Sequence, residues 1–263
     1  MTEVVLVTGG SSGIGYALAA RLAAEGCVVY ELSRRENAPA GVRHLGADIT
    51  DQAAVTAAIA QIAQEQGRLD ILINNAGSGV SGAVEFVETA AAEHLLQVDF
   101  FGCVHTVRAA LPLMRQQGGG RILNISSVAA PIAIPFQAYY SAAKAALHAF
   151  SLALASEIRP FGIRVCSVLP GDIASGFTAA REKQHAGDEI YQGRISRSVA
   201  VMEHDEQHGM TVETAAARLC RLARRRRLPL VYVLGGKYKF FVLLSRLLPS
   251  GLLNRLVALI YAK

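Results

Sequence analysis

Short apolar runs alternate with amphipathic segments along most of the 263-residue chain. The runs are rich in valine, isoleucine and leucine, as buried strands are, and the segments between them repeat apolar residues at helical spacing. We predict strands at residues 3–8, 27–33, 42–48, 69–77, 120–126, 163–171 and 229–234, and helices at 13–26, 51–67, 89–116, 139–158 and 212–224. This alternation predicts an α/β fold, a doubly wound parallel sheet with helices on both faces.

Two segments depart from this rhythm. Residues 172–210 are long, polar and mixed, and an insertion of that length in a compact domain is typically functional, often a lid. Residues 236–263 carry apolar residues at helical spacing, but Arg246, Pro249, Asn254 and Arg255 interrupt them, so we expect no bilayer-spanning helix. We predict a single domain at 1–235, with a substrate lid at about 172–210, and an amphipathic helical extension at 236–263.

Composition and charge narrow the classes of function. Apolar residues make up 52% and charged residues 18%, which indicates a large core and excludes a disordered chain. The net charge of +5 owes much to "RLARRRR" at 221–227, a local cluster without interleaved aromatic residues, so nucleic acid is not an expected partner. The amino-terminal residues pass directly into a strand pattern, and we expect no export signal.

The four cysteines are scattered and lack the spacing of a metal site. We expect reduced, buried thiols, no metal and a cytoplasmic location. The cysteines are Cys27, Cys103, Cys166 and Cys220.

The sequence "TGGSSGIG" at 8–15 lies between the first predicted strand and the first predicted helix. Glycines allow a tight turn and a close approach to a pyrophosphate, and the start of the next helix offers free N–H groups. Many strand-to-helix turns also need glycine, so the loop alone leaves both interpretations open. The context around it favours a dinucleotide site.

Five motifs occur in an order that resembles the short-chain dehydrogenase/reductase family. They are TGxxxGxG from Thr8, "NNAG" at 74–77, Ser127, YxxxK at Tyr140 and Lys144, and "PG" at 170–171, and the resemblance covers about residues 3–235. It implies a Rossmann-like fold, oxidoreductase activity and a homodimer or homotetramer. It also implies cofactor contacts at Gly9, Ser11, Ser12, Gly13, Ile14, Gly15, Ile49, Asn75, Ala76, Gly77, Tyr140, Lys144, Pro170, Gly171 and Ile173.

The end of the second strand distinguishes the two nicotinamide cofactors. Sites for NAD favour a carboxylate there, which binds the ribose 2′-hydroxyl, whereas this chain has Ser33 followed by Arg34 and Arg35. A hydroxyl and guanidinium groups suit a phosphate dianion, and we predict NADP(H) as the cofactor. The alternative is that both arginines are solvated surface residues. Asp48 resembles the family's adenine contact, or else is a carboxylate at a helix start.

Reduction of a ketone requires a proton donor near the carbonyl oxygen. Residues four apart share one face of a helix, so Tyr140 lies beside Lys144, whose charge favours the phenolate and lowers the tyrosine pKa. Tyr139, five residues from Lys144, is expected to point away and to pack. Ser127 matches the family's serine that binds the substrate carbonyl, and Ser126 should face the other way. Lys144 would also hold the nicotinamide ribose by the same resemblance.

One position departs from the family pattern. The family usually has asparagine in the helix before the serine strand, and this chain has Asp99 there, in "VDFFG". In relatives this position supports a proton-relay water through its backbone carbonyl, which an aspartate also supplies. We therefore include Asp99 with Ser127, Tyr140 and Lys144 as a catalytic residue, and the alternative is a structural role in kinking the helix.

These inferences predict an NADP-dependent oxidoreductase that interconverts a ketone and a secondary alcohol. Apolar residues in the lid favour a lipophilic substrate, or else they only pack the lid: Ile173, Phe177, Tyr191, Val199, Val201 and Met202. The extension resembles the ends of family members that reduce steroids, ketosphingoid bases or other lipids. It could cover the substrate mouth, pair with a second subunit, or contact a membrane peripherally with help from the arginine cluster.

Two alternative functions remain open at this point. One is a 3-oxoacyl-thioester reductase that acts on acyl-carrier protein. The other, from a different class, is a non-catalytic NADP-binding regulatory protein.

Overall fold

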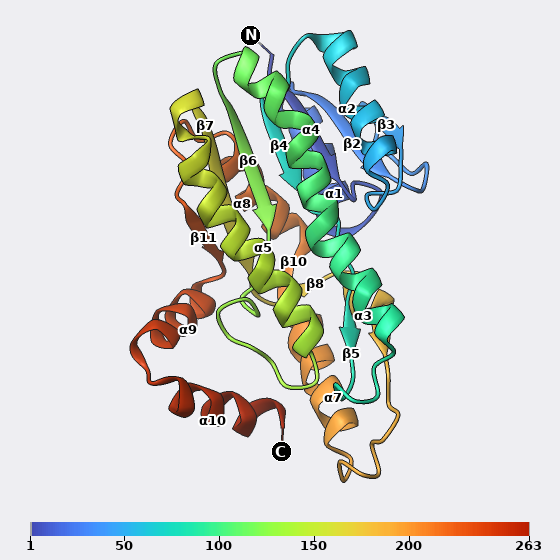
Figure 1. Cartoon of the computed structure of the whole chain (residues 1–263), viewed down its shortest axis with the longest axis vertical. Coiled ribbons are helices and arrows are strands. Elements are labelled where there is room, and N and C mark those ends of the chain that lie inside the picture. The colour runs from blue at the N-terminus through green and yellow to red at the C-terminus, as the bar shows by residue number, and fades with distance from the viewer. Residues whose placement is uncertain (1, 263) are drawn as a thin grey trace.

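The computed structural model describes residues 2–262 and contains one seven-stranded parallel sheet (Figure 1). Its strand order is β11-β7-β6-β4-β1-β2-β3, and every neighbouring pair is parallel. The strands are β1 (Val4–Thr8), β2 (Val28–Ser33), β3 (Val42–Gly46), β4 (Ile71–Asn74), β6 (Gly120–Ile125), β7 (Ile163–Pro170) and β11 (Val231–Leu234). The chain first builds outward from β1 to β3 and then returns to β4 on the other side. The crevice between β1 and β4 is therefore the switch point where such sheets bind ligands.

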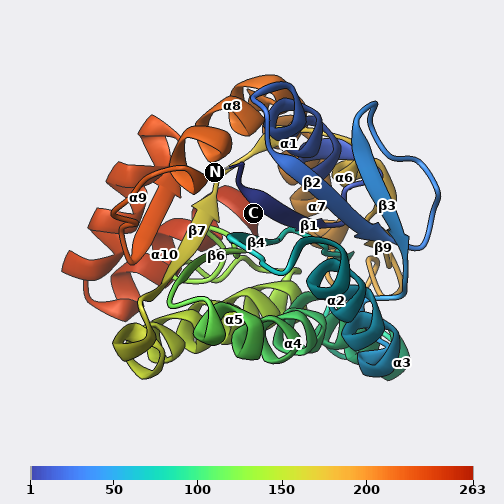
Figure 2. The ribbon, with the colours of Figure 1, turned by 90° about the horizontal axis from the view of Figure 1, so that it is seen from above.

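Helices cover both faces of the sheet (Figure 2). On one face lie α1 (Gly13–Ala24) and α8 (Val212–Ala223), and on the other lie α2 (Gln52–Gln66), α4 (Gly102–Gln116) and α5 (Ala138–Glu157). Alternate side chains of β1 supply the two cores: Val5 packs with the α1 and α8 residues, whereas Leu6 packs with those of α2, α4 and α5. The predicted doubly wound fold is confirmed.

The region predicted as a single helix at 89–116 is interrupted. It consists of α3 (Thr89–Leu96), a π-helical turn (Gln97–Phe101) and α4. The apolar spacing is continuous through the turn, so the sequence pattern does not reveal it. Insertions of this kind locally displace the helix register and often occur at functional sites, and Asp99 lies in the middle of this one.

The predicted lid region contains more regular structure than its polar sequence indicates. It comprises β8 (Ile173–Ala174), α6 (Phe177–Ala180), β9 (Glu182–Lys183), α7 (Arg194–Gln207) and β10 (Met210–Thr211). Strands β8 and β10 pair with each other, and β9 pairs with β5 (Val80–Ser81). Helix α7 was missed because charged residues dominate its sequence, although it buries Ile195, Val199 and Met202 on one face.

The extension forms two helices, α9 (Gly236–Leu247) and α10 (Ser250–Tyr261), separated at Leu248 and Pro249. Helix α9 follows and contacts β11, and α10 turns back to contact α7 (Figure 1). Among residues 2–262, no helix is both long and apolar enough to cross a membrane.

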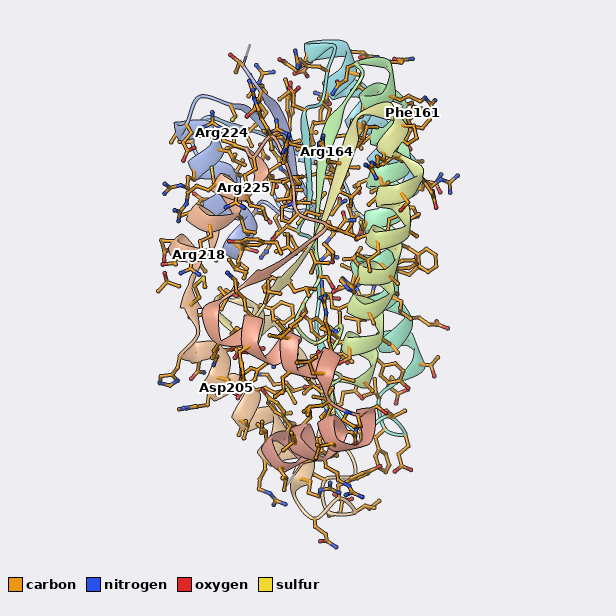
Figure 3. The ribbon with its side chains drawn as sticks, turned by 90° about the vertical axis from the view of Figure 1, so that its left-hand side faces the viewer. Phe161, Arg164, Asp205, Arg218, Arg224 and Arg225 are labelled. Atoms are coloured by element: carbon orange, nitrogen blue, oxygen red, sulfur yellow. The ribbon has the colours of Figure 1, made fainter. Side chains whose placement is uncertain are left out.

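The arginine cluster lies away from these two helices. Arg121, next to the first residue of β6, donates from Nη1 to the carbonyl of Ala223, which lies within the cluster. Figure 3 shows Arg224 and Arg225 at the amino-terminal edge of the sheet, whereas the extension lies toward the carboxyl-terminal edge. The alternative in which the arginine cluster helps the extension at a membrane therefore has no support from their positions.

All four cysteines are buried and free, as predicted. Burial raises the pKa of the Cys166 thiol to about 12.

Candidate active site

The glycine loop fills the turn between β1 and α1. Gly9 and Gly13 have positive φ values of 67° and 52°, which favour glycine. A Cβ on Gly15 would lie 2.3 Å from the carbonyl oxygen of Gly9 and 2.5 Å from Nδ2 of Asn75. The predicted residues from Gly9 to Gly15, including Ser11, Ser12 and Ile14, are thus held as a loop that larger side chains would distort. Such a cradle fits a dinucleotide pyrophosphate.

Residues that follow β4 hold this loop from the other side of the switch point. The backbone amides of Asn75 and Ala76 each donate to the Thr8 hydroxyl at 3.0 Å, and Asn75 Nδ2 donates to the Thr8 carbonyl at 3.1 Å. Asn75 therefore positions the glycine loop itself. Gly77 follows directly, and a Cβ there would lie 3.3 Å from Asp99 and 3.4 Å from Lys144 Nζ, which places this backbone beside two of the candidate catalytic residues.

Hydroxyl and guanidinium groups gather where β2 ends. Arg35 Nη2 donates to Ser12 Oγ at 3.5 Å, and Ser33 Oγ donates to the Arg35 carbonyl at 2.9 Å. Arg34 is largely exposed and forms a long ion pair with Asp48 at 3.8 Å. The acid on β2, Glu31, is fully buried against His44. The carboxyl end of β2 and the glycine loop beside it therefore together present cationic and hydroxyl hydrogen-bond donors.

Asp48 does not cap a helix. Its Oδ1 accepts from the backbone amide of Thr50 at 2.9 Å and from the Thr50 hydroxyl at 2.8 Å, and these bonds hold the pKa of the carboxyl below its ordinary value. Asp51 caps α2 instead. The side chain of Ile49, also predicted as a cofactor contact, is buried against Gly102. The alternative that Asp48 is the carboxylate at the start of the helix is therefore wrong, because Asp51 occupies that position.

Ser127, Tyr140 and Lys144 converge at the carboxyl-terminal end of β6. Ser127 follows this strand and hydrogen-bonds Tyr140, while Lys144 Nζ lies 5.6 Å from the centre of the Tyr140 ring. Ser126 turns the other way, and its hydroxyl donates to the Lys144 carbonyl at 2.8 Å. Tyr139 packs near α3 and donates to the Val84 carbonyl at 3.2 Å. As predicted, Tyr140 lies beside Lys144 and Tyr139 packs elsewhere.

Lys144 is almost completely buried and has two partners. Its Nζ lies 2.9 Å from Asp99 Oδ2 and donates to the Ile125 carbonyl at 3.2 Å. Burial alone would lower the pKa of Lys144, but the charges of Asp99 and Tyr140 outweigh it, and the pKa is raised. The lysine is therefore charged at neutral pH.

Asp99 is held by more than the lysine. It is 1% exposed, and its Oδ1 accepts from the Ser78 backbone amide at 2.6 Å and from the Ser78 hydroxyl at 3.1 Å. Removing one partner from such a buried pair is costly because the other charge then stays unpaired. The aspartate thus has an electrostatic contact with Lys144 in addition to its place in the π-helical turn, and Ser78 is a site residue that the sequence motifs did not indicate.

The pKa of Tyr140 is higher than predicted. Burial raises it, Lys144 lowers it, Asp99 raises it again, and the hydrogen bond from Ser127 lowers it, with a net value above the ordinary one. Lys144 acts in the predicted direction, but its charge is partly neutralised by Asp99. Lys144 therefore lowers the pKa of this tyrosine as predicted, but burial outweighs that effect and the net pKa is raised.

The "PG" motif lies between the site and the extension. Pro170 ends β7, and its carbonyl accepts from the Val128 amide at 3.0 Å. A Cβ on Gly171 would lie 2.0 Å from the Tyr238 ring of α9, so this position requires glycine. Ile173 is buried in the core. Ser175 was not predicted, yet it lies 4.0 Å from a Cβ on Gly13, across the loop, where its hydroxyl could reach a phosphate.

One residue of the predicted lid contacts Tyr140, the candidate acid. The rings of Phe177 and Tyr140 are 5.9 Å apart, and the Arg181 guanidinium lies 5.4 Å from the Phe177 ring centre. Tyr191 contacts Phe86 and Phe136 edge-on, farther out. Val199 and Met202 are buried on the inner face of α7, and Val201 is half-buried. Val199 and Met202 therefore pack the lid on the domain. Of the six apolar lid residues, Phe177 is the one that contacts Tyr140.

This arrangement combines the groups that carbonyl reduction requires. Tyr140 lies within reach of Ser127, a buried cation lies beside the tyrosine ring, and a glycine cradle follows β1. The cradle and the donors at the end of β2 fit a phosphorylated dinucleotide.

Comparisons with known proteins agree with this chemistry. A family model described as short chain dehydrogenase matches residues 3–186. A protein of Bacteroides thetaiotaomicron named 3-ketodihydrosphingosine reductase is 37% identical over 270 residues, which cover 99% of this chain and 98% of that protein.

Two solved structures are also similar. A short-chain dehydrogenase from Streptomyces avermitilis has a TM-score of 0.81 and 32% identity, with 92% of this chain and 91% of that chain covered. The structure of ElxO with NADP bound has a TM-score of 0.75 and 25% identity, with 91% and 100% covered.

Proposed function

Because the chain belongs to the short-chain dehydrogenase family, we propose that it is an NADP-dependent reductase of a lipophilic ketone. The observation that carries this proposal is the convergence of Ser127, Tyr140 and Lys144 beside the glycine loop. The same convergence counts against a non-catalytic, cofactor-binding regulatory protein, which has no need of a positioned acid.

The bound cofactor would supply a hydride to the substrate carbonyl carbon. Tyr140 donates its proton to the carbonyl oxygen as negative charge develops there, and Ser127 donates a hydrogen bond to the same oxygen. Removal of one such donor typically costs about 10²–10³-fold in rate. Lys144 favours the phenolate that remains, and Asp99 with Ile125 holds the ammonium group in place. In the reverse direction, Tyr140 accepts the proton.

The side chains at the end of β2 support a preference for NADP. Ser12, Ser33 and Arg35 form a connected group, and Arg34 is exposed beside them. A 2′-phosphate dianion would meet hydroxyl and guanidinium donors there and no exposed carboxylate on β2. Charge-assisted bonds of this kind contribute about 1.5–3 kcal/mol each.

The substrate class that we propose is a long-chain 3-ketosphingoid base. Support comes from the similarity to a 3-ketodihydrosphingosine reductase over nearly the full length of both chains, including the extension. Phe177 offers an aromatic face beside Tyr140 on which an alkyl chain can pack. A 3-oxoacyl-thioester reductase remains the second candidate, because its reacting ketone is also β to a polar group and would meet the same residues.

A substrate panel tests this proposal. The purified chain is supplied with NADPH or NADH and with 3-ketodihydrosphingosine, an acetoacetyl thioester, a steroid ketone or a small ketone, and cofactor absorbance is followed. We expect the highest kcat/KM with the sphingoid base and NADPH. A higher value with NADH overturns the cofactor assignment, and a higher value with the thioester replaces the substrate class.

A homodimer or homotetramer also remains part of the proposal. Alanine and other small residues on α5 allow close approach of a second helix, and light scattering of the purified protein measures the mass directly. A monomer at working concentration would overturn it.

A further inference from the structure

The exposed apolar side chains of this protein are concentrated on the last two helices. Of the fourteen large apolar side chains exposed in residues 2–262, eight lie on α9 and α10. The two most exposed on α9 are Phe240 at 61% and Leu247 at 72%, and those on α10 are Leu259 and Ile260 at 55% each. Isolated exposed apolar residues are ordinary, but a continuous group indicates an interaction surface.

These side chains form a stripe on each helix. On α9 the exposed residues Phe240, Leu243 and Leu247 follow helical spacing, while Val242 on the opposite side is buried. On α10 the spacing of Leu252, Leu256, Leu259 and Ile260 is that of one helix face, and Val257 is buried on the other. Each helix therefore has two apolar faces, of which only one packs on the domain.

The charges of the same segment have one sign. Residues 236–263 contain no aspartate or glutamate. Lys237, Lys239, Arg246 and Arg255 are all exposed beside the two stripes. A second copy docked about a two-fold axis would place this cationic segment against its own equivalent. An anionic lipid surface matches both the apolar stripes and the flanking cations.

The position of the two helices relates this surface to the active site. Tyr238 of α9 packs on Gly171 and hydrogen-bonds Asp172, directly after the "PG" motif. The Ala262 carbonyl, just after α10, accepts from Arg194 Nε of the lid helix at 2.7 Å, and Tyr261 reaches Asp205 of the same helix. The stripes therefore lie on helices that contact both the site and its lid.

We propose that the outer faces of α9 and α10 dock on an anionic lipid bilayer, from which a long-chain substrate reaches the lid. The choice of a lipid substrate rests on the proposed function, whereas the docking itself rests on the two stripes and their cations. The helices lie in the plane of the interface and do not cross the bilayer.

Vesicle sedimentation with the full-length protein tests the docking without any substrate. The probes are vesicles of phosphatidylcholine alone and vesicles that also contain phosphatidylglycerol. We expect the wild type to sediment with the anionic vesicles and at least tenfold less with the neutral ones, and added salt should weaken the binding. A wild type that stays in the supernatant with both vesicle types overturns the proposal.

A double variant, Leu256→Glu with Leu259→Glu, tests the surface itself. We expect at least tenfold weaker binding to anionic vesicles, with unchanged circular dichroism and turnover of a water-soluble ketone. Phe161→Glu is the matched control, because Phe161 is an exposed apolar residue at the opposite edge of the sheet (Figure 3), and it should bind like the wild type.

If both variants bind like the wild type, the stripes are not the docking surface and the proposal is wrong. If the wild type does not bind vesicles and the double variant has a lower mass than the wild type in light scattering, a second copy covers the stripes instead. Vesicle binding by a protein that does not reduce sphingoid bases would overturn the proposed substrate and leave the docking intact.

Discussion

Replacement of Asp99 by asparagine separates the charge of this side chain from its place in the helix. The variant keeps the shape of the π-helical turn and loses the charge 2.9 Å from Lys144 Nζ. Because Asp99 raises the pKa of Tyr140, its neutralisation must lower that pKa. The carboxylate oxygen lies 2.9 Å and the Tyr140 ring centre 5.6 Å from Lys144 Nζ, so the two are at most about 8.5 Å apart, and a unit charge at an effective dielectric of 20 contributes at least about 2 kcal/mol.

The assay is the pH dependence of kcat/KM for oxidation of the alcohol product with NADP. Oxidation requires the deprotonated Tyr140, so the rate rises with pH through the pKa of the free enzyme. The limb of the Asp99→Asn profile should move to lower pH, because the charge that raises the Tyr140 pKa is gone. Ser78→Ala is the control, since it removes the hydroxyl hydrogen bond to the carboxylate, keeps the one from the backbone amide, and keeps the charge, so its limb should stay in place. A limb that is unmoved in Asp99→Asn, or moves upward, would refute the electrostatic role.

Two further substitutions examine the cofactor cradle. Arg35→Ala should lower kcat/KM for NADPH by about 10- to 100-fold and leave kcat/KM for NADH nearly unchanged, because one charge-assisted bond to the phosphate is lost. Arg164→Ala, at an exposed position, is the control. An equal loss with both cofactors would contradict a phosphate contact. Gly15→Ala should abolish NADPH binding, measured by fluorescence titration, because its Cβ would lie 2.3 Å from the Gly9 carbonyl. Gly176→Ala, with open space around the position, should bind normally.

The alternation of strands and helices was predictable because the strands are short apolar runs and the helices repeat apolar residues at helical spacing. Boundaries differed by only a few residues, as for α5, predicted at 139–158 and found at Ala138–Glu157. The π-helical turn around Asp99 was not predictable, because the apolar spacing continues through it. Helix α7 was missed since its buried face is short and its exposed face is highly charged.

The site was predictable where one element carries two of its members, as with Tyr140 and Lys144 on α5. Contacts between distant segments were not. Ser78 meets Asp99 across 21 positions, and nothing in its own neighbourhood indicates that partner. The net pKa of Tyr140 also depends on burial and on Asp99 together, which no spacing rule contains. The location of the arginine cluster was not predictable either, since a charge run does not reveal which edge of the sheet it occupies.

The central claim is that Tyr140 is the acid that protonates the substrate. Its most direct test is turnover of 3-ketodihydrosphingosine with NADPH by Tyr140→Phe, measured beside Tyr139→Phe. We predict a fall of roughly 10²–10⁴-fold for Tyr140→Phe with NADPH binding unchanged, and a mild effect for Tyr139→Phe, whose hydroxyl contacts only the Val84 carbonyl among the hydrogen bonds described. Turnover by Tyr140→Phe within a few-fold of the wild type would contradict the account.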